Sequence, residues 1–279
     1  SVSYPHYSTF LSIGTASNMI YPITGGEYIL PKSEKALDNF LAAHGCKNPL
    51  VKGYGMCELG ATATTSFDGM DCAEAVGAPL PKVIVSAFDP DTDEELQYGQ
   101  RGELRVDTPC RMKEYFRNPD ATAAFFKQDG AGQIWGCTGD IGYVDANGYV
   151  HILGRASDCY IACDGKKYYL FDTKAVILQD DAVFQCEVVN VTVDSAQRLI
   201  AHIILDKGVF GDDIQRIITR IHALCKAKLP VHAIPYAYKL REDFPVSENS
   251  NKKDMHKLKT DFEGLIFAHE LDAKNWESD

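Results

Sequence analysis

The sequence predicts a mixed α/β (α+β) protein with a β-rich first part and a small α/β second part. Residues 32–45 carry apolar side chains at helical spacing and end at Gly45, which predicts a helix. Residues 82–90 and 102–106 are strand-like, with turn-forming residues between them. After residue 158, strand-like runs surround an amphipathic helical pattern, which predicts a compact α/β domain.

Other elements are expected in both parts. Residues 137–158 predict a hairpin whose turn is Asp145–Gly148. The remaining expectations are a short strand at 49–55, a short helix starting near Asn118, a helical or apolar run at 174–179, strands at 183–193 and 198–206, a helix at 212–229 ended by Pro230, and a strand leading to a loop at 237–246.

The composition is that of a soluble globular protein. The chain has 279 residues, enough for one large or two medium domains, with 45% hydrophobic residues and a net charge of −11. This charge disfavours nucleic-acid binding. The sequence lacks an apolar run of about 18 residues and a signal-peptide pattern, so we expect a cytoplasmic protein without a membrane span. The nine cysteines are irregularly spaced, which favours free thiols over disulfides or zinc.

Two glycine-containing stretches in the first part are candidates for ligand binding. Gly25 and Gly26 would let a ligand approach the backbone closely. Tyr54, between two glycines, could present its ring to a flat heterocycle, and Glu58 could bind a hard cation through oxygen. Taken alone, each stretch is explained better as a plain turn.

Charged residues beside the hairpin and near the C-terminus form a second group of candidates. Asp140, expected at a loop tip, could accept hydrogen bonds from a ribose diol or simply form a turn. Arg155, at a strand end, could bind ribose, phosphate or carboxylate, or form a surface ion pair. Lys252, in the loop 244–254, could contact a phosphate or carboxylate oxygen, although a solvated loop is the simpler interpretation.

The order of these motifs resembles that of the adenylate-forming superfamily, which includes acyl-CoA synthetases, luciferases and the adenylation domains of peptide synthetases. Gly-Gly-Glu and Tyr-Gly-x-x-Glu are followed by Gly-Glu-Leu, Thr-Gly-Asp, Gly-Arg-x-x-Asp and a late lysine, from about residue 5 to about residue 260. Within this superfamily, the sequence most resembles bacterial acyl-CoA synthetases acting on fatty or other carboxylic acids. The resemblance implies that residues 1–157 are the C-terminal part of a large AMP-binding domain. Residues 158–279 would be a small mobile domain, with a hinge near Asp158.

The resemblance also implies roles for individual residues. Tyr54 matches the residue that stacks on adenine, Asp140 the acid that holds the ribose hydroxyls, and Arg155 the arginine on the ribose and phosphate side. Glu58 matches the magnesium-binding glutamate and Lys252 the catalytic lysine that contacts the carboxylate and the α-phosphate. The nucleotide-binding set as a whole is Gly25, Gly26, Glu27, Tyr54, Gly55, Cys57, Asp140 and Arg155.

The activity implied is ligation in two half-reactions. A carboxylic acid would react with ATP, assisted by Mg²⁺, to give acyl-AMP and pyrophosphate, and the acyl group would then pass to coenzyme A. Two alternatives are an adenylation unit that loads a carrier-protein thiol and a catalytically weakened nucleotide-binding homologue. The family's phosphate-binding loop has no copy here, so we expect a fragment that needs the missing N-terminal portion of the enzyme and is inactive alone.

Several positions depart from the family pattern. Cys57 replaces the usual threonine, and Leu170 and Asp172 stand where proline and glutamate are common. Pro245 lies one residue farther from Lys252 than expected, which makes Lys253 a rival for the catalytic role.

Overall fold

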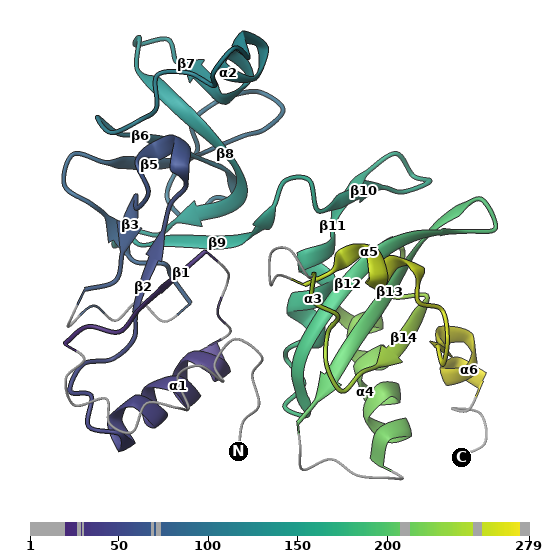
Figure 1. Cartoon of the computed structure of the whole chain (residues 1–279). Helices are drawn as coiled ribbons and strands as arrows, with labels where there is room; N and C mark the ends of the chain where they lie inside the picture. The colour runs from purple at the N-terminus through teal and green to yellow at the C-terminus, as the bar shows by residue number, and fades with distance from the viewer. Residues whose placement is uncertain are drawn as a thin grey trace. The chain divides into compact units, whose positions relative to one another are not determined.

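The computed structural model describes residues 20–26, 29, 31–67, 70, 74–206, 213–247 and 253–273. The chain forms two compact units, Ser1–Ala156 (unit 1) and Ser157–Asp279 (unit 2). Both units combine sheets with short helices (Figure 1), so the mixed α/β class is confirmed. The candidate residues Glu27 and Lys252 lie outside the described part of the chain.

The first sheet of unit 1 contains the glycine-rich stretches. Its elements are β1 (Ile23–Gly25), α1 (Pro31–Ala43), β2 (Val51–Tyr54), the 3₁₀ turn η2 (Cys57–Leu59), β3 (Thr64–Thr65) and β4 (Ala78–Pro79). The strand order is β1–β2–β3–β4, and β1 runs parallel to β2. The predicted helix is confirmed as α1, whose Leu41 is buried together with Cys46 and Leu50.

The second sheet of unit 1 is antiparallel and contains the predicted hairpin. Its elements are β5 (Ile84–Phe88), β6 (Gly102–Asp107), α2 (Pro119–Phe125), β7 (Phe126–Gln128), β8 (Ile134–Val144) and β9 (Val150–Arg155). The strand order is β5–β6–β8–β7, and β9 pairs with β8. The Asn118 side chain accepts a hydrogen bond from the Ala121 amide at 3.1 Å, which caps α2 as the sequence predicted.

Unit 2 is built around a sheet with the order β12–β13–β14–β15. Its elements are β10 (Cys159–Ile161), β11 (Lys167–Tyr169), α3 (Leu170–Ile177), β12 (Val183–Val193), β13 (Ala196–Leu205), α4 (Asp213–Lys228), the 3₁₀ turn η3 (Val231–Ala233), β14 (Ala237–Leu240), α5 (Met255–Thr260), β15 (Ile266–Phe267) and α6 (Ala268–Ala273). The long strands and α4 fall where the sequence predicted them, because their apolar periodicity is strong.

Side chains of β12 alternate between two apolar clusters. Cys186 and Val188 belong to the cluster that includes α3 and α4, whereas Val189 and Val191 belong to a second cluster with Phe244 and with Leu258 of α5. Successive side chains of a strand point to opposite faces of its sheet. The sheet is therefore covered on both faces, and odd-numbered residues of this stretch point toward α5.

The short hairpin of β10 and β11 was not predicted. Its strands have three residues each, too few for a periodic signal, and they are fixed by antiparallel pairing of Cys159 with Tyr169 and of Ile161 with Lys167. Within the described residues, no helix is long and apolar enough to cross a membrane. The described cysteines are free thiols.

Candidate functional site

The carboxyl ends of β1 and β2 bring two predicted glycines next to the tyrosine motif. The two strands are parallel, and Gly25 is the register partner of Gly53. A Cβ atom at Gly25 would lie only 2.8 Å from the Gly53 carbonyl oxygen, so the strands approach closely there because the side chain is absent. Parallel strands place their carboxyl ends at the same sheet edge, where ligands of open α/β sheets bind.

Gly55 allows the chain to fold back directly after β2. A Cβ atom at this position would lie 1.7 Å from the carbonyl oxygen of Ala61, a distance that no side chain can occupy. The Tyr54 carbonyl accepts a hydrogen bond from the Ala63 amide at 2.7 Å, which closes the same turn. The turn therefore fixes Tyr54 at the end of its strand, and glycine is required for steric reasons.

The hydroxyl of Tyr54 donates a hydrogen bond to Asp140 Oδ2 at 2.6 Å. Burial raises the pKa of Tyr54, and the neighbouring Asp140 carboxylate raises that pKa further. Tyr54 is therefore a neutral hydrogen-bond donor at any physiological pH. This contact joins residues that are far apart in sequence, one from each sheet of unit 1.

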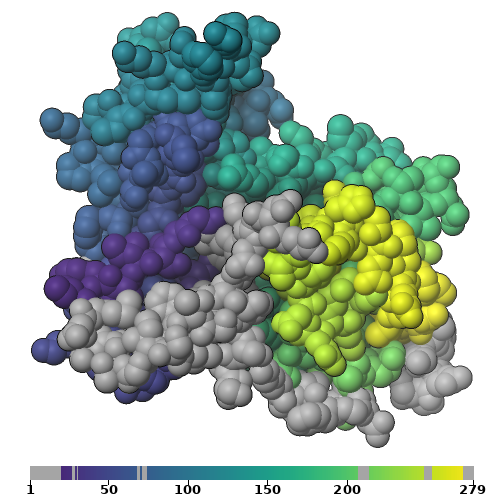
Figure 2. All heavy atoms as spheres, in the orientation of Figure 1, coloured from purple at the N-terminus to yellow at the C-terminus, as the bar shows by residue number. Residues whose placement is uncertain are grey.

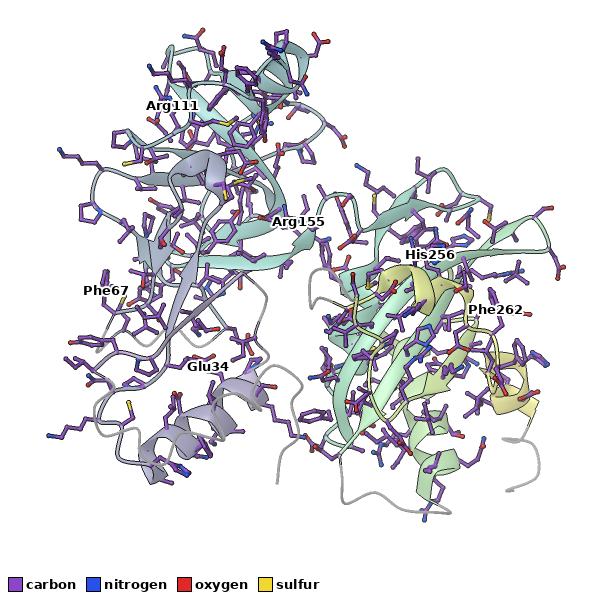
Figure 3. All side chains as sticks on the ribbon, viewed as in Figure 1. Glu34, Phe67, Arg111, Arg155, His256 and Phe262 are labelled. Carbon is purple, nitrogen blue, oxygen red and sulfur yellow. The ribbon has the colours of Figure 1, made fainter. Side chains whose placement is uncertain are left out.

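Asp140 and Arg155 face each other across the hairpin. They are register partners on β8 and β9, and Arg155 Nε lies 3.0 Å from Asp140 Oδ1. A second guanidinium nitrogen of Arg155 donates to the Thr138 carbonyl at 3.1 Å. The Asp140 side chain is 8% exposed and that of Arg155, labelled in Figure 3, is 57% exposed, so the arginine is the exposed member of the pair.

The expectation that Asp140 lies at a loop tip is wrong. Asp140 is a buried residue inside β8, which continues to Val144 before the hairpin turns. Its amide donates to Thr138 Oγ1 at 3.1 Å, and that hydroxyl in turn donates to the Leu104 carbonyl on β6 at 2.6 Å. The carboxylate is thus held by the sheet itself and not by a mobile turn.

Together these residues form a polar site that combines an aromatic ring, a carboxylate and a guanidinium group. An ionised carboxylate accepts hydrogen bonds through two oxygens, which suits the paired hydroxyls of a ribose. A guanidinium group suits phosphate or hydroxyl oxygens, and the ring of Tyr54 suits a flat base. The structure therefore brings together Tyr54, Asp140 and Arg155 in unit 1. Gly25 lies on the strand that pairs with that of Tyr54, Gly26 follows it in the chain, and Gly55 follows Tyr54.

Glu58 lies in η2, inside the loop that the bond between Tyr54 and Ala63 closes. Its Oε1 accepts a hydrogen bond from the Tyr115 hydroxyl at 2.7 Å, and its backbone carbonyl accepts one from the Met112 amide at 2.7 Å. That side-chain bond raises the pKa of Tyr115, which keeps the phenol a neutral donor. The contacts fix Glu58 against the segment before α2.

The Glu58 carboxylate is also suited to binding Mg²⁺. The part of the chain that the structure describes has no group of three or more His, Cys, Asp or Glu side chains that could hold a metal. Mg²⁺ does not require such a cage, because it is usually held by one or two carboxylates together with substrate phosphates and water. A single half-buried carboxylate at the turn after β2 meets that requirement.

Two other candidates occupy less informative positions. Cys57 is exposed and lies in η2 beside Glu58. Asp158 lies in unit 2, in the short connection between β9 and β10, and its carbonyl accepts a hydrogen bond from the Leu170 amide at 2.9 Å.

Comparison with known proteins identifies the family. Residues 17–116 match the family model described as AMP-binding enzyme. Over 190 residues the chain is 37% identical to YdaB of Bacillus subtilis strain 168, a protein named as an acyl-CoA ligase; the match covers 67% of this chain and 35% of YdaB. It is 29% identical over 199 residues to a long-chain-fatty-acid–CoA ligase of the same organism, covering 70% of this chain and 33% of the relative.

Solved structures of related enzymes are also similar to this chain. ATP-bound MatB from Rhodopseudomonas palustris matches with a TM-score of 0.68 and 27% identity, covering 85% of this chain and 44% of MatB. The amide bond synthetase McbA from Marinactinospora thermotolerans matches with a TM-score of 0.68 and 26% identity, covering 85% of this chain and 45% of McbA.

The chain belongs to the adenylate-forming superfamily. It spans about a third of the length of the curated relatives named above.

Sequence reasoning missed two residues that support the candidate site. Thr138 holds the Asp140 backbone, and Tyr115 holds Glu58. Both belong to stretches that resemble the family, but sequence order alone does not show which hydroxyl reaches which carboxylate. Tyr115 lies far from Glu58 in the sequence, so this pair had no local signal.

Proposed function

We propose that this chain is part of an AMP-forming acid–thiol ligase, an acyl-CoA synthetase-like enzyme that activates a carboxylic acid as acyl-AMP and transfers the acyl group to coenzyme A. The observation that carries the proposal is the cluster of Tyr54, Asp140 and Arg155, which combines a ring, a diol acceptor and a cation in a chain of adenylate-forming ancestry.

Each residue of the cluster has a chemical task in this proposal. Tyr54 offers its ring to adenine, and Gly25, Gly26 and Gly55 keep the backbone close to the ligand. Asp140 accepts hydrogen bonds from the ribose hydroxyls, and Arg155 contacts ribose and phosphate oxygens. The β8–β9 register presents the acid and the cation side by side, so the ribose meets groups that need little rearrangement to bind it.

The adenylation step needs positive charge at the α-phosphate. Glu58 would hold Mg²⁺, which neutralises charge that develops on the phosphate oxygens. We assign to Lys252 the contact with the substrate carboxylate and the α-phosphate, as a point charge that stabilises the transition state. Glu27 would line the adenine and the acyl pocket, and Cys57 would lie in the same nucleotide-binding loop.

The domain assignment belongs to the proposal too. Residues 1–157 would be the end of the AMP-binding domain, and residues 158–279 the small domain that turns about Asp158 between the half-reactions. The enzyme would be cytoplasmic and serve fatty acid or related acyl metabolism. The phosphate-binding loop would come from a part of the enzyme not contained in this chain, so the chain alone would not adenylate.

The proposal is tested by measuring pyrophosphate exchange that depends on a carboxylic acid, in the full-length enzyme and in this chain. We expect the full-length enzyme to exchange pyrophosphate into ATP with one class of carboxylic acid, and this chain alone to show none. AMP release is then measured with coenzyme A, with a carrier protein and with an amine as acceptor, because an amide bond synthetase is among the similar structures. Release with coenzyme A supports the proposal.

Other outcomes would contradict parts of the proposed function. Release only with a carrier protein would favour the loading alternative, and nucleotide binding without exchange for any acid would favour a weakened homologue. Robust exchange by this chain alone would exclude the missing-loop proposal. For the hinge, Asp158→Pro should slow thioester formation more than adenylation, and an equal loss of both steps would contradict a pivot at this residue.

A further inference from the structure

The tip of the β10–β11 hairpin in unit 2 carries a cysteine and an aspartate side by side. The Gly165 amide donates to the Ala162 carbonyl at 2.9 Å, and the Ala162 amide donates to the Lys166 carbonyl at 3.0 Å. Gly165 has a positive φ of 76°, as is usual where a left-handed glycine ends a three-residue hairpin loop. Cys163 and Asp164 occupy the turn before this glycine, and the hairpin lies at the surface of unit 2 (Figure 2).

A histidine from another element lies beside both residues. The sulfur of Cys163 is 3.9 Å from Nδ1 of His232, which belongs to η3, and Nε2 of the same ring is 3.9 Å from Asp164 Oδ2. An imidazole with its proton on Nε2, facing the carboxylate, presents an electron pair on Nδ1 to the thiol. Contacts of this length are common in nucleophile–base pairs before a ligand binds. The order thiol, imidazole, carboxylate is one that activates nucleophiles.

The position of His232 is fixed by bonds to the backbone of η3. The hydroxyl of Tyr160 on β10 donates to the His232 carbonyl. The hydroxyl of Thr173 on α3 donates to the carbonyl of the buried Ala233 at 2.7 Å. These bonds tie η3 to the hairpin and to α3, so the imidazole is held beside the hairpin tip by the fold of unit 2.

Asp164 is ionised at neutral pH. The Tyr168 hydroxyl donates to its Oδ2 at 2.7 Å, and the Lys166 amide donates to its Oδ1 at 3.0 Å. These two hydrogen bonds lower the pKa of the carboxyl. An ionised carboxylate beside Nε2 stabilises the imidazolium ion that forms when Nδ1 of His232 accepts a proton.

The other titratable groups that face the sulfur are phenols. They are Tyr160 of β10 and Tyr168 of β11. Burial raises the pKa of Tyr160 to about 12, and the hydrogen bond to Asp164 raises the pKa of Tyr168. Both phenols are therefore neutral at physiological pH. Among the described residues around the sulfur, His232 is then the base that can take the thiol proton.

Two lysines follow the turn and indicate the kind of molecule that would react there. Lys166 and Lys167 are exposed, and the ammonium of Lys167 lies 5.9 Å from the centre of the Tyr169 ring. Their positive charge attracts small anions to the exposed turn. Thiolates exchange with disulfides at a rate set by thiolate fraction and access. A small disulfide that carries carboxylate groups meets both conditions.

We propose that Cys163 is a thiol–disulfide exchange site, at which His232 accepts the thiol proton and the thiolate attacks a small anionic disulfide. Asp164 is a positioning residue that orients the imidazole. The site is independent of the proposed function, because all of its groups lie in unit 2 and no nucleotide takes part.

The reaction balances without a further oxidant. The S–H bond of Cys163 breaks and its proton moves to Nδ1 of His232. The thiolate attacks one sulfur of the disulfide RS–SR, so a Cys163 S–SR bond forms while the S–S bond breaks. The second sulfur leaves with the electron pair of that bond, takes the proton from His232 and departs as RSH. Cys163 is oxidised, the departing sulfur is reduced, and a thiol reverses the reaction.

Mixed-disulfide formation in this chain tests the site. The chain is incubated with oxidised glutathione at pH 7, quenched with acid and analysed by peptide mass spectrometry. Cys57 and Cys110 are the matched comparison, because they are also exposed and no histidine of the described residues forms a hydrogen bond with their sulfurs. Cys163 should react about tenfold faster than either, because an unassisted thiol is only a few per cent thiolate at this pH. Equal rates at the three cysteines would overturn the proposal.

Two variants test the roles of the base and the carboxylate. His232→Gln should slow the reaction of Cys163 by about tenfold, whereas His256→Gln, which removes an exposed histidine of α5, should not. Between pH 8 and pH 6 the rate in His232→Gln should fall about tenfold per pH unit, as for an unassisted thiol, and less steeply in the wild type. Asp164→Asn should give an intermediate slope. Equal rates in His232→Gln and His256→Gln contradict a role for the imidazole.

Buried cysteines report whether unit 2 stays folded in these variants. Cys186 and Cys225 are fully buried and should remain unmodified throughout. If they react in His232→Gln, the pH profile of Asp164→Asn decides instead, since this change lies in an exposed turn. A wild-type slope in Asp164→Asn overturns the positioning role.

The class of disulfide is tested with a cationic one. The chain has a net charge of −11, so the preference of Cys163 for oxidised glutathione over cystamine is expressed relative to that of Cys57 and Cys110. This relative preference should exceed one at low ionic strength, and added salt or the double change Lys166→Gln and Lys167→Gln should remove it. A relative preference for cystamine contradicts the anionic class. Oxidation by hydrogen peroxide without any mixed disulfide contradicts exchange.

Discussion

Two carboxylates with little exposed surface, Asp140 in unit 1 and Glu187 in unit 2, are used in different ways. Asp140 pairs with Arg155, its register partner on the next strand, so the pair is local to one hairpin. Glu187 pairs with Lys253, 66 residues away in the sequence, and with Lys174 of α3. The first pair presents charged groups on a rigid sheet, whereas the second ties a loop to a core.

The partners differ in exposure as well as in distance along the chain. Arg155 is 57% exposed and Asp140 also accepts from the Tyr54 hydroxyl, so both groups border a surface where a ligand can bind. Glu187 meets two ammonium groups and the edge of an apolar cluster. The pair at the proposed binding surface thus has an exposed partner, whereas the partners of Glu187 come from separate elements.

The largest expected effect on nucleotide binding comes from the Asp140 carboxylate. Asp140→Ala should raise the KM for ATP in the full-length enzyme by roughly 10- to 100-fold, because hydrogen bonds to a charged group contribute about 1.5–3 kcal/mol. The hairpin should remain folded, because its backbone register does not depend on this side chain. Steady-state kinetics and circular dichroism measure the two quantities.

Asp145→Asn is the control within the same hairpin. The Asp145 side chain accepts from the amides of Asn147 and Tyr149 in the turn, both at 2.9 Å, and asparagine can keep these bonds. Its KM for ATP should match that of the wild type. An equal rise in both variants would mean that Asp140 acts only through the fold of the hairpin.

The next effect concerns acid sensitivity of unit 2. Burial lowers the pKa of His202 to about 4, helped by Arg241, whose Nε donates to its Nδ1 at 3.0 Å. An unfolded histidine has a pKa near 6.5, so the unfolded state binds the proton first as the pH falls. The stability that the neutral His202 provides is complete above about pH 6.5 and is lost progressively toward pH 4, by roughly 3 kcal/mol in total.

His202→Gln should flatten this acid dependence, measured by hydrogen exchange of the β12 and β13 amides between pH 6.5 and 4.5. His222 is also buried with a lowered pKa, so some dependence should persist. The exposed His256→Gln is the control and should keep the wild-type profile (Figure 3). An unchanged slope in His202→Gln would show that the buried histidine does not limit stability in acid.

The smallest expected effect comes from Tyr54→Phe. This change removes the hydroxyl that donates to Asp140 but keeps the ring. We expect a loss of about 1 kcal/mol in the stability of unit 1, and a smaller rise in the KM for ATP than in Tyr54→Ala, which removes the ring as well. Equal KM values for the two variants would assign the role of Tyr54 to its hydroxyl.

Regular elements were predictable from the sequence because their signals are local. The periodicity of 212–229 and the apolar runs at 183–193 and 198–206 correspond to α4, β12 and β13. Asp140 was misplaced because Thr-Gly-Asp has the chemistry of a turn, and Gly139 indeed has a positive φ of 68°. The extended pairing of β8 with β6 and β9 overrides that local preference.

The contacts within the candidate site were less predictable than the residues. Motif order selected Tyr54, Asp140 and Arg155, but not the bond between the Tyr54 hydroxyl and the acid. Nothing in the local sequence around Glu187 or Lys253 indicates that they pair, because the pair exists only after β12 and α5 pack together. Long-range ion pairs follow from the tertiary fold and leave no periodic trace in the sequence.

The bridge between Val246 and Lys253 and the bond from the Asp254 amide to the Pro245 carbonyl hold the backbone directly before α5. The Asp254 cap then holds the first turn of the helix, and the fully buried Leu258 holds the next. Because backbone contacts and one apolar side chain share this task, single substitutions on the exposed face of α5 should leave the helix in place.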